Sequence, residues 1–130
     1  MSNLDVLKKG YQLFAEGNIE AVLELWDEKI VWHECPGFPF IEDEGIFVGG
    51  QAIVEGVLAK LPTHYDDFKI EIHDFVVGGD KIVMVGYYTG VWKATGKRFK
   101  ANATHTWTFN KDGKPNAFFQ AVDTALIINP

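Results

Sequence analysis

The segment from Phe99 to Phe109 alternates between two kinds of side chain. Its odd positions are apolar or aromatic apart from one histidine, and its even positions are lysine, asparagine and threonine. Because successive side chains on a β-strand point to opposite faces, this pattern predicts a long strand with one buried face. The histidine, His105, falls on that buried face. A titratable ring in such a place serves either as a proton-transfer group in a pocket or as a neutral, hydrogen-bonded core residue.

Further strands are expected around this segment in the second half of the chain. Alternating or continuous apolar runs predict them at Phe68–Ile72, Ile82–Trp92 and about Asn116–Ile128. Turn sequences at Gly78–Asp80 and Lys111–Lys114 separate them. The second run is apolar on both faces, which indicates a central strand.

Three short helices are expected in the first half of the chain. Apolar side chains recur at helical spacing in Leu4–Phe14, Ile19–Trp26 and Gln51–Leu61, and Pro62 is expected to end the third helix. Ile30–Cys35 is a short β-branched and aromatic run that predicts a strand. Helices followed by a meander of long strands indicate an α+β fold, with a strongly curved, mostly antiparallel sheet wrapped around three N-terminal helices and enclosing an apolar cavity.

Length and charge narrow the class of protein. The chain has 130 residues, so residues 1–130 are expected to form a single domain. Its net charge is -6 and its Lys and Arg residues are scattered, which argues against nucleic acid or a membrane as partner. The single cysteine, Cys35, fits a reducing compartment, and no signal peptide or membrane span is visible, so a cytoplasmic location is expected. Neither metal-ligand spacing nor a cofactor fingerprint occurs, so we expect no metal and no cofactor.

The order of these elements resembles the nuclear-transport-factor-2-like superfamily, and most closely its SnoaL-like and ketosteroid-isomerase-like branch. The segments that carry the resemblance are Phe14–Ala21, Ile30–Gly37, Gly49–Ile53, Ala94–Lys97 and His105–Phe109. The resemblance implies a cone-shaped domain. Because this fold hosts isomerases, cyclases and binding domains, the resemblance is much more specific for fold than for chemistry.

The resemblance also implies candidate site residues. SnoaL-type cyclases pair a histidine on the later strand with an aspartate on the last strand, which here implies catalytic residues His105 and Asp123. Ketosteroid isomerases place a general-base aspartate where this chain has Cys35, beside Glu34. They use a tyrosine of the first helix as a hydrogen-bond donor, and Tyr11 lies one residue from the matching place.

Two alternatives stay open at this point. Trp32 and Glu34 share one face of their short strand while Cys35 lies on the other, and only one face lines the cavity. The isomerase resemblance favours the Cys35 face, whereas Glu34 is the stronger base if the register differs. Asp123 either pairs with His105, or caps its strand, or pairs across a dimer interface. Aromatic side chains expected around the cavity are Tyr11, Phe14, Trp32 and Trp107.

Two functions are therefore expected, together with a second subunit. The first is a small cofactor-independent acid–base isomerase or cyclase that acts on an apolar carbonyl-bearing molecule, with His105 oriented and charged by Asp123. The alternative is a non-catalytic binding domain for a small apolar ligand, or a protein-interaction module. Apolar side chains on the outward side of the central strand predict a homodimer. These are Val83, Val85, Tyr87 and Val91.

Overall fold

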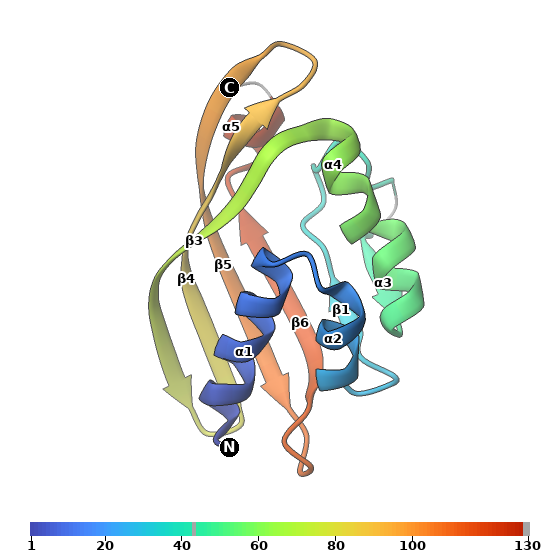
Figure 1. Cartoon of the computed structure of the whole chain (residues 1–130), viewed down its shortest axis with the longest axis vertical. Coiled ribbons are helices and arrows are strands. Elements are labelled where there is room, and N and C mark those ends of the chain that lie inside the picture. Colours follow the sequence, from blue (N-terminus) through green and yellow to red (C-terminus); the bar gives the residue numbers. More distant parts are fainter. Residues whose placement is uncertain (43, 129–130) are drawn as a thin grey trace.

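One curved sheet of six strands forms the frame of the protein (Figure 1). The computed structural model describes residues 1–42 and 44–128. The strands are β1 (Val31–His33), β2 (Ile46–Val48), β3 (Tyr65–Gly78), β4 (Lys81–Trp92), β5 (Lys97–Phe109) and β6 (Pro115–Val122). Their order in the sheet is β2-β1-β6-β5-β4-β3, and every pair is antiparallel except β1 and β6. The expected α+β architecture with a mostly antiparallel sheet is confirmed.

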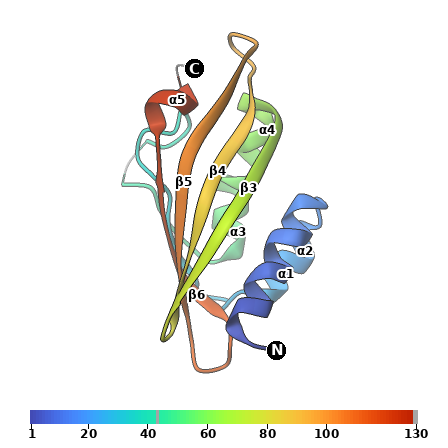
Figure 2. The same ribbon diagram turned by 90° about the vertical axis from the view of Figure 1, so that its left-hand side faces the viewer.

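Short helices precede, separate and follow the strands. They are α1 (Asn3–Ala15), α2 (Ile19–Leu25), α3 (Gly50–Gly56), α4 (Leu61–His64) and α5 (Thr124–Ile128), with the 3-10 turn η1 (Leu58–Lys60) between α3 and α4. Figure 2 shows α1, α2 and α3 on the same side of the sheet. The space between α1 and the sheet is where the candidate site lies.

Local sequence signals set the ends of the first two helices. The backbone N–H of Asp5 donates to Ser2 Oγ at 3.1 Å, and the Asp5 carboxylate accepts from the Ser2 backbone, which completes a capping box. Gly17 follows α1 at φ +77°, a conformation that costs glycine little. Asn18 then caps α2 by accepting from the Ala21 N–H at 3.3 Å.

The third helix is more broken than its apolar spacing predicts. The expected helix Gln51–Leu61 is divided into α3, η1 and α4. Pro62 does not end a helix but lies in the first turn of α4. A first turn suits proline because the backbone N–H groups there have no partner within the helix. A further strand, β2, was not predicted from the sequence, and it pairs with β1 through three residues.

The last expected strand, Asn116–Ile128, ends six residues early. β6 stops at Val122, and Thr124–Ile128 forms α5 instead. Asp123 lies between them, and its Oδ1 accepts from the Leu126 N–H at 3.3 Å, as a helix cap does. The Tyr65 hydroxyl donates to the Ile127 carbonyl at 3.4 Å and joins α5 to the start of β3.

The burial of β5 follows the predicted alternation. Its odd positions from Phe99 to Phe109 are buried, and its even positions are half-buried or exposed. His105 is only 3% exposed and lies on the face that the helices cover. The strand therefore carries its histidine into the interior, as the alternation predicts.

Candidate functional site

A small cavity lies between α1, α2, the α3–α4 region and the covered face of the sheet. Its volume is about 60 Å³, which leaves room for a few water molecules. Its walls are almost entirely apolar, with Leu7, Phe14, Trp26, Trp32 and Phe118 among them. The side chains that bring polar atoms into it are Tyr11, Glu34, Tyr88, His105, Trp107 and Gln120.

A larger groove of about 830 Å³ runs between α1, α4 and β3. Its polar residues include Lys8, Gln12 and Lys69. Several side chains line both the groove and the cavity, so the two spaces are neighbours that share a wall. The shared residues are Tyr11, Phe14, Leu58, Leu61, Phe68 and Ile70.

His105 stands between two tyrosines. The hydroxyl of Tyr11 on α1 is hydrogen-bonded to Nδ1 of the ring, with 2.7 Å between the two atoms. The hydroxyl of Tyr88 on β4 is hydrogen-bonded to Nε2. The rings of Tyr11 and His105 also stack, with their centroids 5.8 Å apart. Both ring nitrogens are therefore engaged, and both partners are uncharged hydroxyls.

Each tyrosine hydroxyl has a second partner. The Trp107 indole N–H donates to Tyr11 Oη at 2.9 Å, and Gln120 Nε2 donates to Tyr88 Oη at 2.5 Å. Gln120 is held in turn by the Cys35 backbone N–H, which donates to its Oε1 at 3.1 Å. The result is a continuous hydrogen-bonded chain from Trp107 to the backbone of the β1 exit.

Burial keeps this chain uncharged around neutral pH. It lowers the pKa of His105 from 6.5 to about 3, because the charged ring loses its hydration without gaining an anionic partner. It raises the pKa of Tyr11 and that of Tyr88 well above the usual range for a phenol. His105 is therefore a neutral imidazole, and both tyrosines keep their protons.

Glu34 is the buried carboxyl group of the cavity, and one of its oxygens lacks a hydrogen bond among the described residues. It is 3% exposed, and its Oε1 has no hydrogen bond within residues 1–42 and 44–128. Burial raises its pKa from 4.5 to about 8, and the neighbouring N–H groups of Cys35 and Trp32 offset only a part of that effect. A carboxyl group in this state is mainly protonated at neutral pH yet can release its proton close to it, which suits a proton-transfer group.

Most of the predicted cavity residues do lie at the cavity. Tyr11, Phe14, Trp32, Glu34 and Trp107 all line it, as does His105. Of the two faces of β1 considered in the sequence analysis, the one with Trp32 and Glu34 is buried. Trp32 stacks on Phe118 with ring centroids 3.7 Å apart.

Cys35 does not line the cavity, contrary to the expectation drawn from the isomerase resemblance. Its side chain lies on the other face of the β1 exit, and its thiol contacts the Pro36 carbonyl at 3.6 Å. The parallel pairing of Trp32 with Phe118 and of His33 with Phe119 sets this orientation. Cys35 contributes its backbone N–H to the site and not its thiol.

The expected pair of His105 and Asp123 is not formed. Asp123 is exposed and caps α5, while both nitrogens of His105 are bonded to tyrosines. The reason is the phase of β6, in which Phe118 and Gln120 point inward. Phe119, on the same side of the strand as Asp123, is 57% exposed.

Two members of the site, Tyr88 and Gln120, were not predicted from the sequence. Gln120 is the residue directly opposite His105 in the β5–β6 ladder. Tyr88 faces the cavity from β4, which is apolar on both faces, so its sequence context does not distinguish it from core. Gln120 could have been predicted by counting residues along β6 from the turn at Gly113, but only if it had been known which side of that strand faces the cavity.

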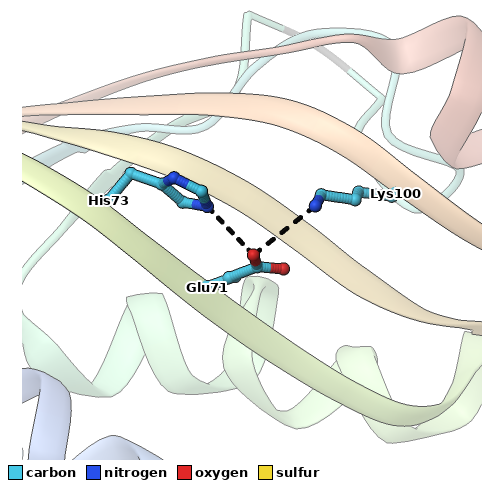
Figure 3. Close-up of polar contacts among 3 residues, drawn as sticks. All are labelled: Glu71, His73 and Lys100. Atoms are coloured by element: carbon cyan, nitrogen blue, oxygen red, sulfur yellow. Dashed lines mark hydrogen bonds and ion pairs between the residues drawn. The ribbon is translucent and has the colours of Figure 1, made fainter.

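A second polar cluster lies outside the cavity, on the opposite face of the sheet (Figure 3). Glu71 accepts from His73 Nε2 at 2.9 Å and pairs with Lys100 Nζ at 3.5 Å. The Lys100 ammonium also lies 4.5 Å from the centroid of the Tyr87 ring. The hydrogen bond from His73 is the main cause that lowers the pKa of Glu71. These groups are exposed or half-buried, and none of them lines the cavity.

Neither a membrane helix nor a metal cluster is found in the part of the chain that the structure describes. No helix there is long and apolar enough to cross a membrane. No set of three or more His, Cys, Asp and Glu side chains in the same residues is arranged to hold a metal ion.

A curved antiparallel sheet that closes over N-terminal helices, with a polar chain inside an apolar cavity, defines the class of cone-shaped nuclear-transport-factor-2-like domains. The sequence model of the SnoaL-like domain matches residues 7–115. The chain therefore belongs to the SnoaL-like domain family. No curated protein matches the sequence.

Solved structures agree with this assignment. A nuclear-transport-factor-2-like protein from Burkholderia thailandensis E264 is 26% identical, with 100% of this chain and 99% of that chain covered and a TM-score of 0.89. TerC, co-crystallised with polyporic acid, is 25% identical, with 96% and 97% covered and a TM-score of 0.84. A protein with a ketosteroid isomerase-like fold from Catenulispora acidiphila DSM 44928, in complex with trimethylamine, is 12% identical, with 95% and 88% covered and a TM-score of 0.77. It shares the fold alone.

Proposed function

We propose that the protein is an acid–base enzyme that moves a proton on an apolar, carbonyl-bearing small molecule, as an isomerase or cyclase does. Glu34 is the group that takes and returns the proton. The reaction class is an abstraction of a proton from carbon next to a carbonyl, with a hydrogen-bond donor at the carbonyl oxygen. His105 holds the hydroxyls of Tyr11 and Tyr88 in place and does not exchange the proton itself.

The observation that carries this proposal is the buried carboxyl of Glu34 in an apolar cavity, whose Oε1 has no hydrogen bond among the described residues. Burying a carboxyl without a full set of hydrogen bonds is costly, so a group retained there suggests a use. Its pKa of about 8 leaves roughly one molecule in ten with a carboxylate at pH 7. That carboxylate is a stronger base than an exposed one because it has lost its hydration.

The two spaces suggest the shape of the ligand. The cavity of about 60 Å³ accepts only a small end group, while the groove of about 830 Å³ can hold an apolar body. TerC was co-crystallised with polyporic acid, which supports a ligand larger than the cavity alone and makes polyporic acid a candidate in binding tests. We therefore propose a carbonyl-bearing end in the cavity and the remainder in the groove.

Proton exchange on a simple ketone tests the proposal. The wild-type protein is incubated with 2-cyclohexen-1-one in D2O, and the loss of its exchangeable C–H signals is followed by NMR. Glu34→Gln should lower the protein-dependent exchange rate by about 100-fold or more. Glu42→Gln, which removes an exposed carboxyl, is the matched control and should exchange like wild type. Equal rates for wild type and Glu34→Gln would reject Glu34 as the proton-transfer group.

A binding domain without catalysis is the second candidate. The observation in its favour is that His105, Tyr11, Tyr88 and Gln120 already satisfy one another. In that case the cavity binds an apolar ligand and Glu34 only contributes a hydrogen bond. Ligand binding by calorimetry, together with no exchange above the buffer rate, would favour this alternative.

We also propose that a second copy of the chain covers the uncovered face of the sheet. One residue from each of the six strands lies on this face in a row of directly paired neighbours. From β3 to β2 these residues are Val76, Val83, Thr106, Phe119, His33 and Ile46. Val76 and Phe119 are more than half exposed in the single chain. The oppositely charged Glu71 and Lys100 lie on the same face (Figure 3), so this face carries both signs of charge that a self-complementary interface can pair. Light scattering coupled to size-exclusion chromatography tests this dimer.

A further inference from the structure

The hydrogen bonds around His105 can be counted group by group. A neutral imidazole carries one N–H donor and one nitrogen acceptor. Each neighbouring tyrosine hydroxyl has one proton to donate. Tyr11 Oη already accepts from Trp107, and Tyr88 Oη already accepts from Gln120. Both of these donors are N–H groups that cannot accept in return.

This count leaves one tyrosine proton without a recipient. If Nε2 of His105 carries the ring proton, Tyr11 donates to Nδ1 and the ring donates to Tyr88, whose own proton is then unused. If Nδ1 carries it, Tyr88 donates to the ring and the proton of Tyr11 is unused. In either tautomer one hydroxyl donor within the cavity wall has no recipient in this chain of bonds.

Glu34 breaks the symmetry between the two tyrosines. Gln120 donates to Tyr88 and accepts from the backbone N–H of Cys35, the residue next to Glu34, whereas the second partner of Tyr11 is Trp107. Glu34 Oε1 also has no hydrogen bond among the residues that the structure describes. A hydroxyl dipole that points its proton toward the side of a carboxyl group is favoured over one that points away. The unused proton is therefore best placed on Tyr88.

We infer that His105 carries its proton on Nε2, and that the hydroxyl of Tyr88 is the hydrogen-bond donor presented to the oxygen of the bound ligand. This inference rests on the proposed function, because it assigns the donor at the carbonyl oxygen of the same site. Tyr88 touches the ligand, while His105 and Gln120 are positioning residues that direct its proton. The ligand class that follows carries an acceptor oxygen, such as a ketone, at the end that enters the cavity.

The tautomer can be measured without any ligand. Selective ¹⁵N labelling of histidine and correlation of the ring nitrogens with the ring carbon protons identify which nitrogen carries the proton. A proton on Nε2 alone supports the inference. A proton on Nδ1, or on both nitrogens, overturns it, because Tyr88 is then the donor to the ring or the ring is charged.

A carbonyl probe tests the donor directly. The ¹³C shift of the carbonyl of labelled 2-cyclohexen-1-one should move downfield on binding to wild type. Tyr88→Phe should abolish this movement and weaken binding about 2- to 10-fold, the range expected for one hydrogen bond. Tyr87→Phe, a control on the outward face of the same strand, should keep the downfield shift.

The outcomes separate this inference from the proposed function. A downfield shift that persists in Tyr88→Phe overturns the inference and leaves proton transfer by Glu34 intact. If the ketone does not bind to wild type, the proposed ligand class fails. The tautomer of His105 then still decides which tyrosine holds the free proton.

Discussion

Replacing Glu34 with glutamine keeps the size of the buried side chain and removes its ionisation. In wild type, burial raises the pKa of this carboxyl from 4.5 to about 8, so the folded protein retains a proton that the unfolded chain releases between these values. The free energy of unfolding therefore falls as the pH rises through this window. The loss is about 1.4 kcal/mol per pH unit, or about 5 kcal/mol over the whole window.

His105 acts in the opposite direction at lower pH. Burial lowers its pKa from 6.5 to about 3, so the unfolded chain binds a proton that the folded protein excludes. Its contribution to stability is lost as the pH falls from 6.5 towards 3. The two effects cancel between pH 4.5 and 6.5, and only that of Glu34 remains above 6.5. Between pH 6.5 and 8 wild type is expected to lose about 2 kcal/mol.

Urea unfolding at constant ionic strength measures this loss. Wild type and the exposed control Glu42→Gln should both lose about 2 kcal/mol between pH 6.5 and 8, whereas Glu34→Gln should stay nearly level. A matching decline in Glu34→Gln would refute the reasoning, since the titrating group would then lie elsewhere. No decline in wild type would mean that the carboxyl is hydrated in the folded protein.

Four further predictions follow from the same structure. The ketone exchange rate should rise about tenfold per pH unit up to about pH 8 and then level off, since the carboxylate of Glu34 is the active form; a rate that falls over this range contradicts that role. Asp123→Ala should lower stability in chemical denaturation by about 0.5–2 kcal/mol through loss of the α5 cap and leave exchange unchanged, and a loss of exchange would return Asp123 to the site. Phe119→Lys should convert the expected dimer to a monomer in light scattering, and an unchanged mass would place the interface elsewhere. Gly86→Ala should lower the melting temperature, because its Cβ would lie 2.1 Å from the Glu71 carbonyl oxygen, and an unchanged value would show that the strands can separate there.

Local sequence was sufficient for the elements whose signals are themselves local. The capping box at Ser2 and Asp5 and the glycine at 17 set the ends of α1, since they depend on contacts a few residues apart. The alternation of β5 also settled which way His105 faces, because only one side of that strand is apolar. The order of these elements was enough to predict the curved α+β fold.

The tertiary structure decided which faces of β1 and β6 point inward. Both strands carry apolar or aromatic residues on each side, so the alternation has no unique phase until the strands are paired. The parallel pairing of Trp32 with Phe118 turns Glu34 into the cavity and Cys35 out of it. The same phase puts Gln120 opposite His105 and leaves Asp123 at the surface. The sequence by itself determined the fold and the inward histidine, whereas long-range strand pairing chose the partners that give that histidine its chemistry.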